Sequence, residues 1–180
     1  MRTQSRLRIE MAVRVRNLLR ANPFGEPKAD AVVAKFEERV TRALDLMTQF
    51  QSGTAQVRGS RTKRRELRHK LVTEPLRHLA RVAKAASAQQ PDLGDLLRVP
   101  ARLSEAEFLA VVRGITTRLA PLQELLAEYG LNPSLHDELT GLVASYETYV
   151  NEVDEGRRIH TGARAELDAI ASELIRMVNQ

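Results

Sequence analysis

The sequence predicts an all-α protein: an elongated bundle of up-and-down helices built from an internal duplication, in which a short helix is followed, twice, by a long one of about 45 residues. Three observations support this fold class. The composition is 43% hydrophobic but only 4% aromatic, with few glycines and prolines, which favours helix. Apolar residues recur at alternating spacings of three and four. The two halves also share a pattern of glycines.

The duplication rests on two pairs of glycines. Gly53 and Gly59 lie six residues apart in the first half, and Gly156 and Gly162 lie six apart in the second. The apolar positions around them follow at the same offset: Phe36 aligns with Leu139, Val40 with Val143, Leu67 with Ile170, Leu71 with Leu174 and Val72 with Ile175. A repeat of this kind constrains the architecture more than any single motif does.

The repeat also predicts the domain organisation. A chain of 180 residues suits a single domain, which we expect to be all-helical over residues 1–180. Its first pseudo-repeat spans about 5–86, a linker spans about 87–103, and the second pseudo-repeat spans about 104–178. Ser87 to Gly94 is the polar stretch that best suits the linker.

The first element is ambiguous between strand and helix. From residue 6 to 16 the apolar residues alternate almost strictly with polar ones, which is typical of a strand. However, Leu7, Met11, Val15 and Leu18 also form a helical stripe. We expect a helix, because no second strand exists for a lone strand to pair with. The Arg-rich, acid-poor composition resembles a transit peptide, but the core needs these leucines, which favours a helix of the folded protein.

The first long helix is expected to start near Pro27. Its apolar seam comprises Ala29, Val33, Phe36, Val40, Ala43, Met47, Phe50, Thr54 and Val57. After Val57 the stripe rotates toward Leu67, a change of phase that Gly59 would absorb. Pro75 then kinks or breaks the helix.

The second short helix covers residues 104–129. Ser104 and Glu107 predict a capping box at its start. Seven apolar residues then form one stripe: Phe108, Val112, Ile115, Leu119, Leu122, Leu126 and Tyr129. Pro121 is expected to kink this helix without ending it, and Gly130 is expected to stop it.

The last segment has the most regular seam, which predicts one helix of about 45 residues from Leu135 onward. Its middle layers are small or polar: Gly156, His160 and Ala163, with Arg164 beside them. A neighbouring helix can approach closely there, or a small anion or cofactor can be held. The other interpretation, which we favour, is a polar layer in which His160 is hydrogen-bonded within the bundle.

The net charge of +5 conceals a larger asymmetry. Residues 1–100 carry 21 Lys and Arg against 10 Asp and Glu, whereas residues 101–180 carry 7 against 13. A chain of this kind either binds a polyanion with its basic half or neutralises itself across an internal interface.

The strongest candidate site is the basic stretch Arg58–Lys70, in which Arg58, Arg61, Arg65 and Arg68 share one stripe of a helix and form a basic ridge. Guanidinium groups in a row can follow a phosphate backbone, and each can bind bidentately. No aromatic residue is interleaved, so bases would not be stacked and nucleic-acid binding would be sequence-tolerant.

The alternative for the ridge is internal pairing, which we favour. In this interpretation Arg61 continues the seam that ends at Val57 and points inward. Glu152, Asp154 and Glu155 in the second half supply the carboxylates. A buried layer of this kind would fix the register of the helices more than it would stabilise them.

Metal and cofactor sites are not expected. The chain has no cysteine, and Glu66 with His69 forms a single Glu-x-x-His, whereas a di-iron bundle needs two. The aligned positions in the second half are Ala169 and Ser172. No catalytic residues are assigned, because His160 is the one plausible acid–base group of the seam and one group rarely suffices.

The sequence therefore favours a non-enzymatic helical scaffold or adaptor that binds another macromolecule, either a protein partner or a second copy of the chain. The alternative is sequence-tolerant binding of nucleic acid through the basic ridge, and an enzyme comes third. No apolar run approaches the roughly 18 residues of a membrane span, so no membrane partner is expected. A chain without cysteine suits a reducing compartment, and we expect a cytoplasmic one.

Overall fold

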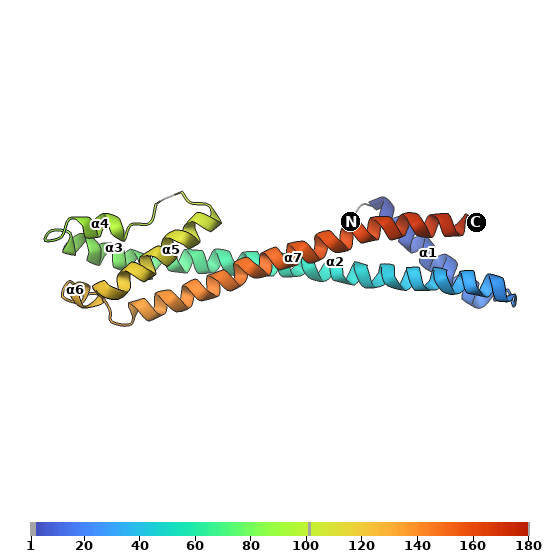
Figure 1. Ribbon diagram of the computed structural model, residues 1–180, viewed down its shortest axis with the longest axis horizontal. Helices are drawn as coiled ribbons and strands as arrows, with labels where there is room; N and C mark the ends of the chain where they lie inside the picture. The colour runs from blue at the N-terminus through green and yellow to red at the C-terminus, as the bar shows by residue number, and fades with distance from the viewer. Residues whose placement is uncertain (1–2, 101, 180) are drawn as a thin grey trace. The chain divides into compact units, whose positions relative to one another are not determined.

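The computed structural model describes residues 3–100 and 102–179, and every regular element of these residues is helical (Figure 1). The elements are α1 (Thr3–Ala21), α2 (Pro27–Thr73), α3 (Pro75–Ala86), α4 (Asp92–Leu96), α5 (Glu105–Leu119), a 3₁₀ turn (Ala120–Leu122), α6 (Gln123–Ala127) and α7 (Leu135–Val178). The all-α class is confirmed: the fold is a helical bundle in which long helices pack against shorter ones. Residues 6–16 belong to α1, as expected.

The chain forms two compact units, and α2 and α7 each run through both of them. The first unit contains the described residues up to Arg58 and those from Val153 onward, and the second unit is Gly59–Glu152. This division differs from the expected pseudo-repeats, whose boundaries stay a prediction.

In the first unit α1 packs against α2 and α7. The buried core residues are Ile9, Ala12, Phe36, Val40, Ala43, Leu46, Ala163, Leu167, Ile170, Ala171 and Leu174. The hydroxyl of Ser5 donates to the Asp168 carboxylate at 2.5 Å and so joins α1 to α7. On the surface, Arg42 pairs with Glu166 at 2.8 Å, an exposed contact that water and salt screen, so it adds little to the stability.

Two glycines allow α2 and α7 to touch at the level of their backbones. A Cβ atom on Gly156 would lie 2.8 Å from Cγ2 of Val57 and 3.0 Å from the carbonyl oxygen of Gly53. A Cβ atom on Gly53 would lie 2.9 Å from the carbonyl oxygen of Gly156 and 2.9 Å from the backbone nitrogen of His160. Both positions would bring a Cβ atom closer than real Cβ contacts allow, so the helices approach this closely only with glycine at the two positions.

The duplication itself is not established by these contacts. Gly53 and Gly156, which align in the proposed repeat, are both tightly packed, whereas a Cβ atom added to Gly59 or Gly162 would meet nothing within 4 Å. The preceding helices differ, however, because α1 is continuous while α5 ends early and is followed by a 3₁₀ turn and α6. The duplication therefore stays a prediction.

The second unit consists of α3 to α6 and the parts of α2 and α7 that pack with them. Its core residues are Leu71, Leu76, Leu79, Val82, Ala83, Ala86, Leu93, Leu97, Phe108, Val112, Ile115, Leu119, Leu126, Leu131, Leu135, Leu139, Val143 and Tyr146. Pro75 breaks α2 from α3 and occupies the first turn of α3, where no backbone N–H is needed. The apolar face of α3 packs into this core, which leaves Arg77, Arg81 and Lys84 exposed on the opposite face.

The boundaries of α5 are partly as predicted. The hydroxyl of Ser104 accepts from the backbone N–H of Glu107 and the Glu107 carboxylate accepts from the backbone N–H of Ser104, so the capping box is confirmed. Gly130, with φ +90, ends the segment. The prediction that Pro121 only kinks the helix is wrong, because α5 ends at Leu119. Proline has no N–H for the α-helical ladder, and the chain continues as a 3₁₀ turn before α6.

The seam of α2 continues past Val57 without the expected change of phase. Its inward positions are Ser60, Arg64, Leu67 and Leu71, at spacings of three and four. Ser60 is buried and donates to the Glu152 carboxylate at 2.6 Å, so a polar residue occupies a core position there. The predictions that Gly59 absorbs a slip and that Arg61 points inward are therefore wrong, and Arg61 is exposed.

We expect Gly156→Ala to destabilise the protein by about 1–3 kcal/mol, because the added methyl group must displace the backbone of α2. Gly162→Ala is the matched control, since its Cβ would meet open space in the same helix, and it should stabilise by about 0.5–1 kcal/mol. Urea unfolding followed by circular dichroism measures both. Equal stabilities of the two variants would contradict the close approach.

Candidate functional site

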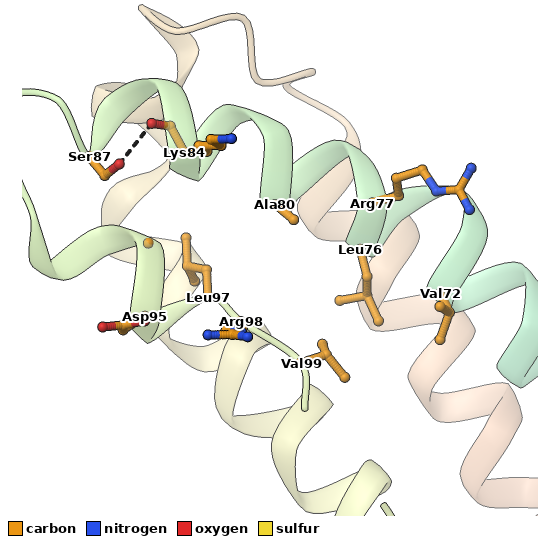
Figure 2. Close-up of a pocket in the computed structure, with 11 residues that line it drawn as sticks. Val72, Leu76, Arg77, Ala80, Lys84, Ser87, Asp95, Leu97, Arg98 and Val99 are labelled. Carbon is orange, nitrogen blue, oxygen red and sulfur yellow. Dashed lines mark hydrogen bonds between the residues drawn. The ribbon is translucent and has the colours of Figure 1, made fainter. Parts of the chain in front are cut away.

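The second unit has a groove between α3 and the segment 94–99, which we call the basic groove (Figure 2). It encloses about 510 Å³, a size typical of ligand sites. The residues that line it are Val72, Leu76, Arg77, Ala80, Lys84, Ser87, Gly94, Asp95, Leu97, Arg98 and Val99.

The floor of the basic groove is apolar. Leu76 and Leu97 are nearly buried, with 5% and 2% of their surfaces exposed, and they belong to the core of the unit. Val72, in the last turn of α2, is 43% exposed, so its side chain is only partly buried by the rest of the chain. Figure 2 shows Leu76, Leu97 and Val99 around the cavity.

Cationic side chains stand on both walls of the groove. Lys84 lies on α3 and Arg98 follows α4 on the opposite wall (Figure 2). Arg77 lines the groove as well, with its guanidinium group pointing away from the cavity. Within the described residues none of these three cations forms an ion pair, and Asp95 is the one carboxylate of the lining. The groove therefore offers positive charge above an apolar floor.

Ser87 is the C-cap residue of α3, and its hydroxyl caps the helix end. It donates to the carbonyl oxygen of Lys84 at 2.8 Å, while the backbone N–H of Ser87 donates to the carbonyl oxygen of Ala83. This hydroxyl is thus engaged in the structure of the helix end.

The four arginines of the basic ridge differ in exposure and in their partners. Arg58 is exposed in the first unit, and Arg61 and Arg65 are exposed in the second. Neither Arg61 nor Arg65 forms an ion pair with any residue that the structure describes. Arg68 is half-buried and bound within the fold.

Arg68 joins α2 to the start of α5. Its Nη2 donates to the carbonyl oxygen of Leu103 at 2.8 Å, and its Nη1 lies 3.3 Å from Oε1 of Glu105. The guanidinium carbon also lies 4.5 Å from the ring centre of Phe108, a cation–π contact. Arg68 is therefore part of the scaffold.

The Glu105 carboxylate contacts three side chains. Besides Arg68, the guanidinium of Arg64 on α2 lies 3.5 Å from it, and the hydroxyl of Tyr146 on α7 donates to it. Burial, together with this hydrogen bond to the carboxylate, raises the pKa of Tyr146 to about 12. The neutral phenol is thus held as a donor between α5 and α7.

The carboxylates expected to pair with the ridge have other partners. Asp154 binds Arg157 at 3.1 Å and Glu155 binds Arg158 at 3.5 Å, each one turn along α7. Glu152 accepts from Ser60. Internal pairing of the ridge thus occurs at Arg68, but its partner is Glu105, which the sequence did not indicate.

The polar layer of α7 lies in the first unit. The Nδ1 of His160 donates to the carbonyl oxygen of Gly156 at 3.1 Å, and its ring lies edge-on to Phe50 with centres 6.0 Å apart. Arg164 is exposed. Gly156 provides the close approach to Gly53, so these contacts are structural, and the three residues do not converge on a common ligand position.

Neither a metal centre nor a membrane span is found in the part of the chain that the structure describes. No group of three or more His, Asp or Glu side chains there is placed to hold a metal ion, and Glu66 and His69 are both exposed. None of the described helices combines the length and apolarity that crossing a bilayer requires.

Arg68→Ala should destabilise the protein by about 1–3 kcal/mol, because it removes a hydrogen bond, an ion pair and the cover of Phe108 together. Arg65→Ala, one turn away on the exposed surface, should change the stability by less than about 0.5 kcal/mol. Thermal and urea unfolding check both values. An Arg68→Ala variant as stable as Arg65→Ala would show that these contacts contribute nothing.

Comparisons with known proteins add no relative. No protein family matches the chain. No curated protein and no solved structure matches it either. The chemistry of its own surfaces is thus the basis for assigning a function.

Proposed function

We propose that this protein is a non-enzymatic adaptor that binds an acidic segment of another protein in the basic groove. The observation that carries the proposal is the combination of an apolar floor with two cations on the walls, Lys84 and Arg98, that form no ion pair among the described residues. A bound apolar side chain would cover Val72 and the floor, while neighbouring carboxylates would meet Lys84 and Arg98. Segments that carry both features suit such a groove.

The two parts of the groove contribute differently to binding. Burial of apolar surface contributes about 25 cal/mol per Å², whereas each exposed ion pair adds only about 0–1 kcal/mol. Most of the affinity would therefore come from the apolar side chain of the ligand as it leaves water, and from the exposed surface of Val72, because Leu76 and Leu97 are already nearly buried. The cations select acidic ligands over basic ones and accelerate their encounter.

Binding is also the activity that the lining residues support best. They include neither His nor Cys, and the one hydroxyl, that of Ser87, is bonded to the carbonyl oxygen of Lys84. A nucleophile with an adjacent base is therefore missing from this set of residues.

A library of short random peptides displayed on phage, selected on the full chain, tests this function. Enriched peptides should carry a Leu, Met or Phe flanked by Asp or Glu. Their affinity, measured by fluorescence anisotropy, should fall at least about tenfold in Lys84→Glu with Arg98→Glu, a loss of about 1.4 kcal/mol. Arg65→Glu with Lys70→Glu makes the same charge change outside the groove and should lower the affinity less. Equal losses in the two variants would refute the groove as the binding site.

Sequence-tolerant binding of nucleic acid is the second candidate function. The observation in its favour is that Arg61 and Arg65 are exposed on one stripe of α2 without ion pairs to described residues. Both side chains are thus available to phosphate groups. Arg68 is not, because it is bound to Leu103 and Glu105.

If nucleic acid is the ligand, its affinity should fall steeply with salt concentration. Arg61→Ala with Arg65→Ala should then reduce the slope of log K against log salt by about 2, since two phosphate contacts are lost. Fluorescence anisotropy with a labelled duplex and a labelled single strand measures the slopes. A slope that is the same in the variant and the wild type would exclude the ridge.

A further inference from the structure

We infer that the first unit carries a separate docking surface, an apolar groove that accepts an amphipathic helix of a partner protein with carboxylates beside its apolar face. The groove encloses about 320 Å³ between α1, the start of α2 and the end of α7. All of its lining residues are apolar: Val15, Leu19, Phe24, Ala29, Val32, Val33, Phe36, Met177 and Val178. It shares no residue with the basic groove and is independent of it.

Large apolar side chains are exposed in and beside this groove. Phe24 and Val32, which line it, are 63% and 56% exposed, and Leu18, next to Leu19 in the sequence, is 63% exposed. A monomeric protein rarely leaves several such side chains together in water. The groove is thus a surface that gains free energy when another molecule covers it.

Beside the groove, a row of exposed apolar residues runs along the neighbouring face of α1. Leu7 and Met11 are 59% and 36% exposed, and Leu18 follows at the spacing of the same helical face. Arg14 fills the intervening position and is also exposed. Spacings of four, three and four are those of a seam that packs against a second helix. The occupant that fits a row of this kind is a helix, which would pack beside the α1, α2 and α7 segments of this unit.

The charge of the surface selects an acidic helix. Over Thr3–Ala21 the sequence has five arginines and one glutamate. Arg14 forms no ion pair with the described residues, and neither do Lys28 and Arg176, which adjoin groove residues in the sequence. Glu26 and Asp30 reduce the positive charge at the start of α2 only. A carboxylate on the partner helix would meet Arg14 in the middle of the seam.

Two other occupants fit less well. A second copy of the chain would bring two arginine-rich α1 helices together, and like charges oppose that contact. A lipid surface would draw Arg14, at the centre of the stripe, toward the acyl region without a carboxylate partner. A helix with acidic flanks satisfies both the apolar groove and Arg14.

Two synthetic peptides of about 18 residues test the inference with the full chain. Both carry leucine at alternating spacings of three and four, and they differ only in the flanking residues, glutamate in one and lysine in the other. Fluorescence anisotropy should show the glutamate peptide binding at least about tenfold more tightly. Equal affinities, or tighter binding of the lysine peptide, would overturn the proposal.

Variants of exposed residues locate the binding, since their folding is not at risk. Leu18→Ser with Phe24→Ser should lower the affinity for the glutamate peptide at least about tenfold. Leu44→Ser changes an exposed apolar residue of the same unit outside the groove and should leave that affinity unchanged. Arg14→Glu should lower the affinity for the glutamate peptide and raise the affinity for the lysine peptide. Lys84→Glu with Arg98→Glu should have no effect, which separates this surface from the basic groove.

Sedimentation and vesicle experiments cover the other occupants. The wild-type chain should sediment as a monomer at micromolar concentration and should not bind vesicles of anionic phospholipid. A dimer that Leu18→Ser with Phe24→Ser dissociates would assign the groove to a second copy and overturn the proposal. Vesicle binding lost in the same variant, without peptide binding by the wild type, would assign the groove to a membrane surface and overturn it as well.

Discussion

The contact between Gly53 and Gly156 is the constraint on which the packing of the first unit depends. Without side chains at these positions the backbones of α2 and α7 meet directly, and Val57 packs against Gly156 beside them. This contact determines which faces of α2 and α7 pack against each other. The larger residues of the core follow along the same faces, and α1 covers them. A side chain at either glycine would separate the helices and disturb each of these layers.

Arginine has two distinct roles in the second unit. Arg64 and Arg68 bind Glu105, and Tyr146 completes the cluster from α7, so these side chains hold α2, α5 and α7 together. Arg61 and Arg65 lie on the same helix but face water. A basic stretch of sequence is thus divided by the helix into a structural face and a free face, and only the free face is available to a ligand.

The helical class, both long helices and the capping box of α5 follow from spacing and composition, because these depend on neighbours along the chain. The predicted seam of α2 is wrong where polar or small residues occupy core positions: Thr54 is exposed and Gly53 lies inside. Glycine has no hydrophobicity to mark it as core. The basic groove depends on contacts between α3 and residues after α4, which no local pattern encodes. The exposed cations of α3 were the available signal, since they share one face of an amphipathic helix.

The charges of the second unit are separated along its sequence as well as paired locally. Residues 59–102, which include every lining residue of the basic groove, contain 11 Lys and Arg against 4 Asp and Glu, whereas residues 103–152 contain 2 against 8. Opposite charges form a permanent electric dipole to the degree that the two segments also lie apart in space. A dipole experiences a torque in the field of a charged surface before any contact forms, over distances comparable with the Debye length, about 8 Å at physiological ionic strength.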